Sequence, residues 1–300
     1  MNTIRSFLRR TLPHYLMLLP FFALFFIFFL WPIVYGLGIS LTKWNGVKDP
    51  AFVGLANYIK IFTDPVIKFP IAMANLGKFI IIVVPVGILI ALCLALLVDR
   101  FTPRWASIFR ALYFFPIIIP LFLSASIWRF LFVDGGVISA ILSKVGITIL
   151  WLNDPNYEIF AVAIVDMWRA IGFHFLLLFA ALKGIPQEYY DAAKVDGAND
   201  FQQIIYITIP QLEPVLFLVV VNAFIGGLQS FDLPWLLSTS QPNNYGGVSQ
   251  GMLFPVMTIF VRAWQGLAFG EASAYAVILG VIVLVITGIQ FAWREWRLAR

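Results

Sequence analysis

Charged side chains and cysteine are both scarce in this chain of 300 residues. Only 12% of its residues are charged, whereas 61% are hydrophobic and 17% are aromatic. A water-soluble domain carries roughly 25% charged residues, so this composition excludes a soluble globular protein and requires a bilayer as solvent. The single cysteine, Cys93, excludes an internal disulfide and a cysteine metal cluster. We expect Cys93 to be a small core or lipid-facing residue.

Other absences limit the possible activities. The sequence contains no G-x-x-x-x-G-K-[ST] pattern, so it has no phosphate-cradling loop of that type. Two histidines, His14 and His174, and scattered carboxylates provide no cluster of the kind that a membrane-embedded enzyme needs. A secondary transporter would need a coupling-ion site and often has internal repeats, and the sequence shows neither. We therefore predict no catalytic residue, cofactor or metal in this chain.

Six long apolar stretches dominate the sequence. A helix needs about 20 mostly apolar residues to cross the hydrocarbon core, and its backbone polar groups must be bonded internally. The sequence predicts an all-α integral membrane protein with six transmembrane helices, in a single domain over residues 1–300 with its core at about residues 78–293. The six stretches are Leu16–Ser40, Lys78–Val98, Ile108–Val133 (with Pro116 and Pro120), Ile159–Leu182, Val215–Leu237 and Ala272–Trp293.

Basic residues at the ends of these stretches predict the orientation. Lysine and arginine concentrate on the cytoplasmic side of membrane proteins. Three groups fall on one side if there are six spans, and they are Arg5, Arg9 and Arg10, then Arg100, Arg104 and Arg110, then Arg294, Arg297 and Arg300. We therefore expect both termini in the cytoplasm. The lysines of the first outer loop oppose this reading only weakly, because long loops count less. Since basic residues lie mainly at segment ends, the net charge of +5 predicts no nucleic-acid partner.

Residues 184–212, between the fourth and fifth stretches, are the most polar long segment. Good helix formers occupy residues 187–195, and Pro186 can start that helix. Glu188 suits its first turn through the helix dipole, and Gly197 permits a turn after it. The residues alone leave two readings open, a plain amphipathic linker on the membrane surface or a docking site for another protein.

A second short helix is expected at residues 200–207. Asn199 or Asp200 can cap it, and Pro210 is expected to end it. The predicted product is a helix–turn–helix on the cytoplasmic side. Ala192 and Ala193 would leave a low surface there that another protein can approach closely.

The order of residues in this loop resembles the signature loop of bacterial ABC importer permeases. In that family the loop begins Glu-Ala-Ala, with a glycine four residues after the second alanine and a proline further on. Asp191 takes the place of the glutamate here and keeps its charge. The residues that the resemblance assigns to coupling with an ATPase are Glu188, Asp191, Ala192, Ala193, Asp196, Gly197, Ala198, Phe201 and Pro210.

Other segments resemble the sugar-type branch of the same family, which is related to maltose and glycerol-phosphate permeases. They are SLTKWN at residues 40–45, FVGLANY at 52–58, DP at 64–65, FRALYFFP at 109–116, IWRFLF at 127–132 and FD at 231–232.

The resemblance implies a non-enzymatic permease subunit in the bacterial cytoplasmic (inner) membrane. It implies a second homologous permease that forms a heterodimer, and two cytoplasmic ATPase subunits that bind ATP and Mg. It also implies an extracytoplasmic binding protein that delivers a carbohydrate, an oligosaccharide in particular, and contact with membrane lipid. Glycerol 3-phosphate or a related polyol remains an alternative substrate.

Several charged residues inside the spans need partners or a cavity. Asp166 and Arg169 lie three residues apart on one helical face, and they either form an ion pair or line the substrate pathway. Arg129 can reach the interface or pair with Asp134. His174 can form a hydrogen bond to a neighbouring helix.

The fifth stretch carries the polar face most suited to a substrate. Asn222, Gly226 and Gln229 recur at helical spacing, and polar groups beside aromatic rings suit a sugar. The alternative is hydrogen bonding to a partner permease. The residues predicted to line the pathway are Asn222, Gly226, Gln229, Phe231, Asp232, Trp235, Asp166 and Arg169.

Overall fold

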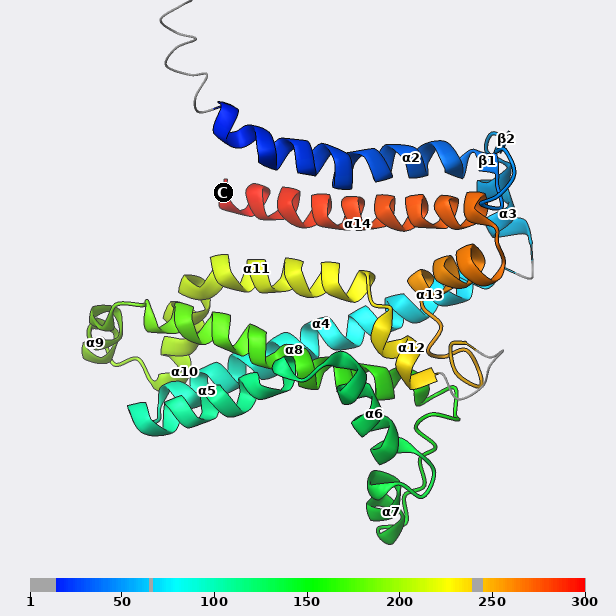
Figure 1. Ribbon diagram of the computed structural model, residues 1–300. Coiled ribbons are helices and arrows are strands. Elements are labelled where there is room, and N and C mark those ends of the chain that lie inside the picture. Colours follow the sequence, from blue (N-terminus) through cyan, green and yellow to red (C-terminus); the bar gives the residue numbers. More distant parts are fainter. Residues whose placement is uncertain (1–14, 65–66, 239–244, 300) are drawn as a thin grey trace, which may run out of the picture. The chain divides into compact units, whose positions relative to one another are not determined.

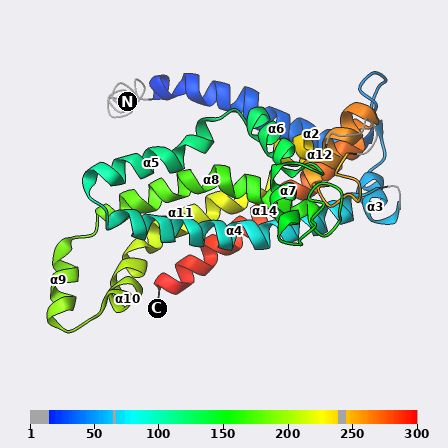
Figure 2. The same cartoon turned by 90° about the horizontal axis from the view of Figure 1, so that it is seen from below.

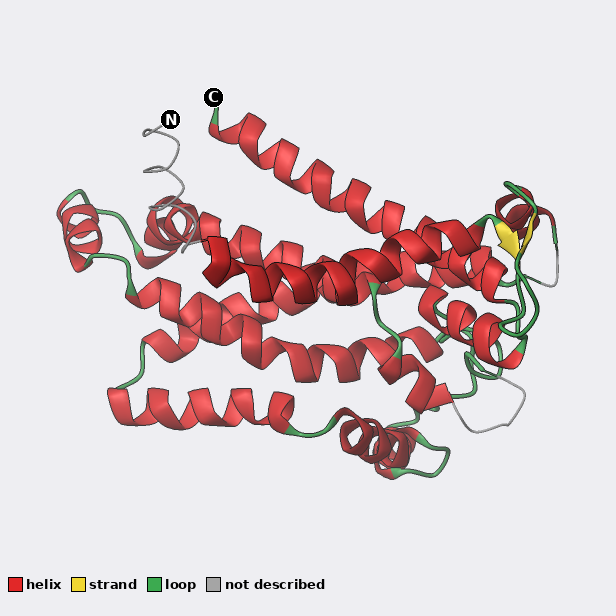
Figure 3. Ribbon diagram, turned by 45° about the horizontal axis from the view of Figure 1, so that its top comes forward, coloured by secondary structure: helices red, strands yellow, loops and turns green. Residues whose placement is uncertain are grey.

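The computed structural model describes residues 15–64, 67–238 and 245–299, and the regular secondary structure of that part is helical except for one short hairpin (Figure 3). Six helical stretches in it are long and apolar enough to cross a membrane, which confirms the predicted fold class. They are Tyr15–Ser40, Phe69–Asp99, Leu121–Lys144, Glu158–Lys183, Asp200–Leu228 and Phe269–Leu298. Arg5, Arg9, Arg10, His14, Pro65 and Arg300 lie outside the described residues.

The chain divides into two compact units. The first comprises the described parts of Met1–Ile67 and Ile259–Val281, and the second comprises those of Lys68–Thr258 and Ile282–Arg300. That the chain forms a single domain over residues 1–300, with its core at about residues 78–293, stays a prediction.

The first unit begins with the helix Tyr15–Ser40 and carries the hairpin. In the hairpin Thr42 pairs with Phe52 and Lys43 with Ala51, antiparallel. The labelled elements of the unit are η1 (Phe26–Leu30), α2 (Trp31–Ser40), β1 (Thr42–Lys43), β2 (Ala51–Phe52), α3 (Ala56–Thr63), η3 (Val261–Gln265) and the first part of α14 (Phe269–Leu298).

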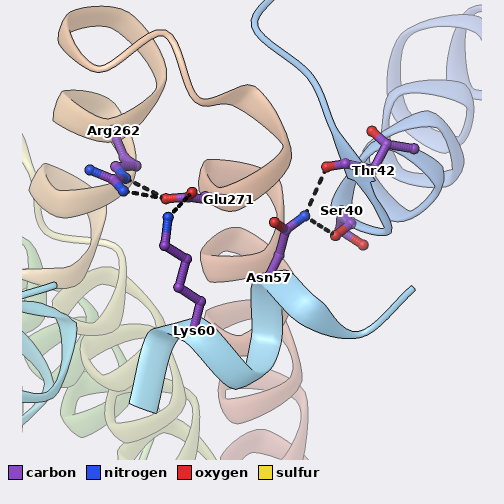
Figure 4. A network of polar contacts seen from close by, with 6 residues as sticks. All are labelled: Ser40, Thr42, Asn57, Lys60, Arg262 and Glu271. Carbon is purple, nitrogen blue, oxygen red and sulfur yellow. Dashed lines mark hydrogen bonds and ion pairs between the residues drawn. The ribbon is translucent and has the colours of Figure 1, made fainter. Parts of the chain in front are cut away.

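A network of polar side chains joins these elements (Figure 4). Asn57 is buried, and its Nδ2 donates to the carbonyls of Ser40 and Thr42, both at 2.8 Å. Glu271 pairs with Lys60 at 2.6 Å and with Arg262 at 2.5 Å. Burial lowers the pKa of Arg262, but the hydrogen bond and charge of Glu271 raise it more, so its pKa lies above the ordinary value. The guanidinium therefore stays charged, and it holds η3 against the start of α14.

The second unit is built around α4 (Phe69–Asp99) and α8 (Glu158–Lys183), which pack against each other along their lengths (Figure 1). In Figure 2, α5 (Pro103–Ile118) and α11 (Ile209–Leu228) run alongside α8. Small residues of α4 and α5 meet large residues of α8 in a buried cluster made of Ala91, Ala95, Val98, Ala106, Phe175, Leu178, Phe179 and Val219. This alternation of small and large side chains brings the helix backbones close together.

Two helices of this unit come very close together at Gly172 of α8. A Cβ placed on Gly172 would collide with the backbone carbonyl oxygen of Tyr113 in α5. Only a residue without a side chain fits here, and α5 is therefore held directly against α8.

The third predicted span is not one helix over Ile108–Val133. The helix α5 ends at Ile118, and α6 (Leu121–Phe132) begins after Pro120. Proline has no amide hydrogen and disfavours helical geometry in the residue before it, and Ile119 is accordingly extended, with φ −66° and ψ 128°. The membrane-length stretch Leu121–Lys144 consists of α6 and α7 (Val137–Lys144), which are separated by residues 133–136.

The fifth predicted span, Val215–Leu237, also has the wrong bounds. The helix α11 ends at Leu228, and a separate helix α12 (Asp232–Ser238) follows. A continuous helix would bring the ring of Pro234 against the carbonyl of Ser230, whereas Pro234 fits the first turn of a new helix. Gln229 and Ser230 therefore lie in a break between these two helices. A further short helix, α13 (Pro255–Phe260), follows later in the chain.

Candidate functional site

The predicted helix at residues 187–195 is confirmed, and its end is a well-formed turn. It is α9 (Gln187–Val195), and Pro186 precedes its first residue. Gly197 has a φ of +82°, a conformation that side chains other than glycine rarely adopt. The Gly197 N–H donates to the carbonyl of Lys194 at 3.1 Å, and the Ala198 N–H to that of Ala193 at 2.8 Å. This is a Schellman motif, and it sets the direction in which the chain leaves α9.

The next helix begins with a capping box. Of the two predicted caps, Asn199 is the one used: its Oδ1 accepts from the Gln202 N–H at 2.9 Å. The Gln202 Oε1 accepts in return from the Asn199 N–H at 2.8 Å. Two otherwise unpaired donors are satisfied this way, and α10 (Asp200–Gln203) starts at a defined point.

Pro210 does not end the second helix, contrary to the prediction. A π-helical turn, η2 (Ile204–Thr208), follows α10, and the chain continues into α11, where Pro210 is the second residue. A proline is tolerated near the start of a helical segment, because its missing N–H leaves few backbone acceptors unpaired. The π turn before it contains one extra residue in the pattern of backbone hydrogen bonds. The polar loop thus continues into the fifth span without a break.

The loop presents an exposed apolar surface, which we call the coupling surface. Its large members are exposed by between 51% and 88%, and they are Tyr189 (51%), Val195 (88%), Phe201 (69%) and Tyr206 (75%). Glu188, Asp191, Ala192 and Asp196 are also exposed, whereas Ala193 and Ala198 are half-buried. Phe201 was predicted from the motif. Tyr189, Val195 and Tyr206 were not predicted to belong to this surface. Large apolar side chains within a polar loop are the signal that could have indicated them.

Polar contacts tie this loop to the membrane helices. Lys183 at the end of α8 pairs with Asp99 of α4 at 2.6 Å, and Arg100 pairs with Asp200 at 3.2 Å. The Tyr190 hydroxyl lies 3.0 Å from that of Thr208, which joins α9 to η2. A cavity of about 440 Å³ lies behind the loop, and Leu96, Leu182, Tyr190, Gln203 and Thr208 are among its lining residues.

A second cavity, of about 170 Å³, lies between α4, α8 and α11. It brings together three of the predicted pathway residues, Asp166, Asn222 and Gly226, and adds His174. A carboxylate, an imidazole and an amide thus share a small space with apolar neighbours, an arrangement that offers hydrogen bonds to hydroxyl groups. The cavity is lined by Val83, Gly87, Asp166, Met167, Ala170, Ile171, His174, Asn222, Ala223, Gly226 and Gly227.

The other predicted pathway residues lie elsewhere. Gln229 follows the end of α11 and does not line the cavity. Phe231 and Trp235 stack on each other, with ring centroids 5.6 Å apart, and Asp232 begins α12. None of these three lines the cavity either.

Two ion pairs that the sequence left open among alternatives do not form in the described part of the chain. Asp166 and Arg169 form none with each other, although they share a helical face, and the buried Arg169 Nε has no hydrogen-bond partner there. Arg169 does not line the cavity. Asp134 accepts from Asn153 at 3.0 Å rather than pairing with Arg129.

Comparison with known proteins gives concordant matches. A family model for the binding-protein-dependent transport system inner membrane component matches residues 83–296. YurN, a probable ABC transporter permease protein of Bacillus subtilis, is 30% identical over 92% of this chain and 94% of its own length. LacF, the lactose transport system permease protein of Rhizobium radiobacter, is 30% identical over 97% of each chain.

A solved structure has the same fold. It is a chain of a bacterial ABC transporter involved in the import of the acidic polysaccharide alginate, and it superimposes with a TM-score of 0.83. The match covers 98% of each chain at 22% sequence identity.

Proposed function

Because this chain belongs to the family of binding-protein-dependent transport system inner membrane components, we propose that it carries a carbohydrate, driven by separate ATPase subunits. Membership makes it an ABC importer permease, a multi-pass protein of the bacterial inner membrane.

The coupling surface is the observation that supports ATPase docking. Exposed aromatic and aliphatic side chains on a rigid, capped helix pair are typical of a protein interface. Phe201 and Val195 would contact a groove of the ATPase, and the Schellman turn at Gly197 would set their spacing. Two ATPase subunits would bind ATP and Mg, one on this chain and one on a second, homologous permease. In this orientation the loop and both termini lie in the cytoplasm.

The small cavity supports a polar, uncharged substrate. Asp166, His174 and Asn222 offer acceptors and donors to hydroxyl groups, and the relative LacF is named for lactose transport. A phosphate group is disfavoured because the carboxylate of Asp166 repels it, which weakens the case for glycerol 3-phosphate.

A second permease is needed to complete the pathway. The cavity of about 170 Å³ is smaller than the pockets of about 300–1,000 Å³ that enclose small molecules. A homologous permease, paired with this chain as a heterodimer, would supply the remaining wall. The substrate, an oligosaccharide in particular, would arrive on an extracytoplasmic binding protein.

Alternating access would follow from movement of the coupling loop. Closure of the ATPase dimer on ATP would draw the two loops together, and the loop would pull on α8 and α11, which it connects. The Lys183–Asp99 pair would carry the movement to α4. ATP hydrolysis would then restore the inward-facing arrangement.

The proposal is tested by purifying the assembled importer through a tag on this chain. The ATPase subunits are expected to co-elute, and reconstituted uptake is expected to need them. Replacing the exposed Phe201 by alanine should weaken co-elution, because interface aromatics commonly contribute about 2 kcal/mol or more to binding. Phe52→Ala is the matched control, since Phe52 is equally exposed but lies in the hairpin. Uptake by this chain alone, or equal effects of both substitutions, would refute the proposal.

A further inference from the structure

Glu158 is a fully buried carboxylate that neither the coupling surface nor the small cavity uses. It is the first residue of α8, where the helix dipole favours a negative charge. Both carboxylate oxygens accept hydrogen bonds from the backbone of one distant loop. Oε2 accepts from the Gly251 N–H at 2.6 Å, and Oε1 accepts from the Ser249 N–H at 3.3 Å. The carboxylate therefore holds that loop against the end of α8.

The loop, residues 245–254, has a backbone shaped to enclose this carboxylate. Gly246 and Gly247 have φ angles of +94° and +89°, and Gln250 has a φ of +65°, a conformation that strains a residue with a side chain. A Cβ on Gly247 would lie 2.7 Å from the Glu158 carboxylate, and one on Gly251 would lie 2.6 Å from its Oε2. The glycines are needed because the carboxylate fills the space that side chains would occupy.

A second buried side chain holds the same loop from α4. The Asn75 Nδ2 donates to the carbonyl of Gln250 at 2.6 Å and to that of Leu253 at 3.2 Å. Phe254 is fully buried, and its ring lies 5.0 Å from that of Phe79 in α4. Only the tip of the loop, Val248 and Ser249, is well exposed.

The helices that hold this loop also support the coupling loop at their opposite ends. Glu158 and Lys183 are the first and last of the 26 residues of α8, and they are about 38 Å apart at 1.5 Å per residue. At the far end Lys183 pairs with Asp99 of α4, and α9 follows after a short connection. Residues 245–254 and the coupling surface are thus attached to opposite ends of one helix pair.

We propose that Glu158 is a positioning residue for transport, one that fixes residues 245–254 as a preformed contact for the binding protein. The inference rests on the proposed function. In that function the loop lies at the end of α8 opposite the ATPase, where the binding protein arrives. Because Glu158 and Asn75 join the loop to α8 and α4, a contact made at Val248 and Ser249 shifts the same helices that end beside the coupling surface. The carboxylate does not touch the substrate.

The test measures ATP hydrolysis by the complete importer in nanodiscs, as a function of the concentration of sugar-loaded binding protein. With Glu158→Gln, the half-saturating concentration should rise about tenfold with the maximal rate kept within about twofold, the effect of losing roughly one hydrogen bond to a charged group. Gly251→Ala should act in the same direction, because its Cβ displaces the carboxylate. Glu295→Gln, which removes an exposed carboxylate in the last turns of α14, should leave both values unchanged.

Hydrogen exchange on the unaltered importer provides a test that does not depend on the folding of a variant. The amides of Ser249 and Gly251 should exchange slowly although Ser249 is exposed, because both donate to Glu158. Fast exchange of both, or an unchanged half-saturating concentration in Glu158→Gln, would overturn the inference and leave the proposed function standing. No stimulation of the unaltered importer by the binding protein would refute both.

Discussion

At the scale of a single residue, Gly197 shows how a local conformation sets the direction of an exposed loop. Its φ of +82° completes the Schellman turn after α9, and no heavy atom lies within 4 Å of the place where a Cβ would be. A side chain there strains the backbone by about 1–2 kcal/mol without meeting any neighbour inside the chain. The cost of substitution is therefore a change in the direction of the coupling loop.

We predict that Gly197→Val uncouples ATP hydrolysis from uptake. Relaxation of the strained turn would move Phe201 relative to Val195 and so weaken the fit of the loop to the ATPase. The ATPase would still hydrolyse ATP, but its movement would be passed to the membrane helices less fully. The ratio of ATP hydrolysed to sugar imported, measured in proteoliposomes, should rise several-fold.

The chain offers a closely matched control at Gly146. This glycine has a φ of +77°, completes a Schellman turn after α7 and also has open space around its Cβ position. Gly146→Val should impose the same strain and leave the ratio unchanged. A normal ratio in Gly197→Val, or an equal rise in both variants, would contradict the assignment of this loop to coupling.

At the scale of the helices, the contact of α5 with α8 depends on Gly172. Its Cβ position overlaps the backbone of Tyr113, and a backbone carbonyl cannot rotate away as a flexible side chain can. We predict that Gly172→Ala forces the two helices apart and destabilises the protein by about 1–3 kcal/mol, as overpacking does. The thermal midpoint of the detergent-solubilised importer, followed by fluorescence size-exclusion chromatography, should fall.

Gly77→Ala is the control for this prediction. Gly77 lies inside α4, and nothing lies within 4 Å of its Cβ position. Alanine favours a helix over glycine by up to about 1 kcal/mol, so the midpoint should stay the same or rise. An unchanged midpoint in Gly172→Ala would show that α5 is free to shift along α8.

The helices also show which parts of the structure short-range sequence signals can predict. The bounds of α9 and the cap at Asn199 follow from residues within one or two turns: the first was predicted, and Asn199 was one of two predicted candidates. Pro210 and Pro120 were misjudged, because a π turn absorbs the first and the second breaks a span that composition alone makes continuous. The contacts of Glu158 were missed, since its partners lie 91 and 93 residues away in the chain and no local pattern indicates them.

At the scale of the whole molecule, the break at Pro120 changes which residues form the third membrane crossing, so the number of crossings needs a direct measurement. Three membrane-length stretches lie between Val47 and Val195: Phe69–Asp99, Leu121–Lys144 and Glu158–Lys183. An odd number of crossings places these two valines on opposite sides of the membrane. Both are 88% exposed, so each is accessible to a reagent in water.

We predict opposite labelling of these two positions by a membrane-impermeant maleimide, in a background that carries Cys93→Ala. The only native cysteine is thereby removed. Val47→Cys should react in spheroplasts, and Val195→Cys should react only in inside-out vesicles stripped of peripheral proteins, because the arginine groups orient the chain with its coupling loop inside. Labelling of both from one side would mean that α6 and α7 do not cross. Labelling with the sides exchanged would place the coupling loop outside, where no ATPase can reach it.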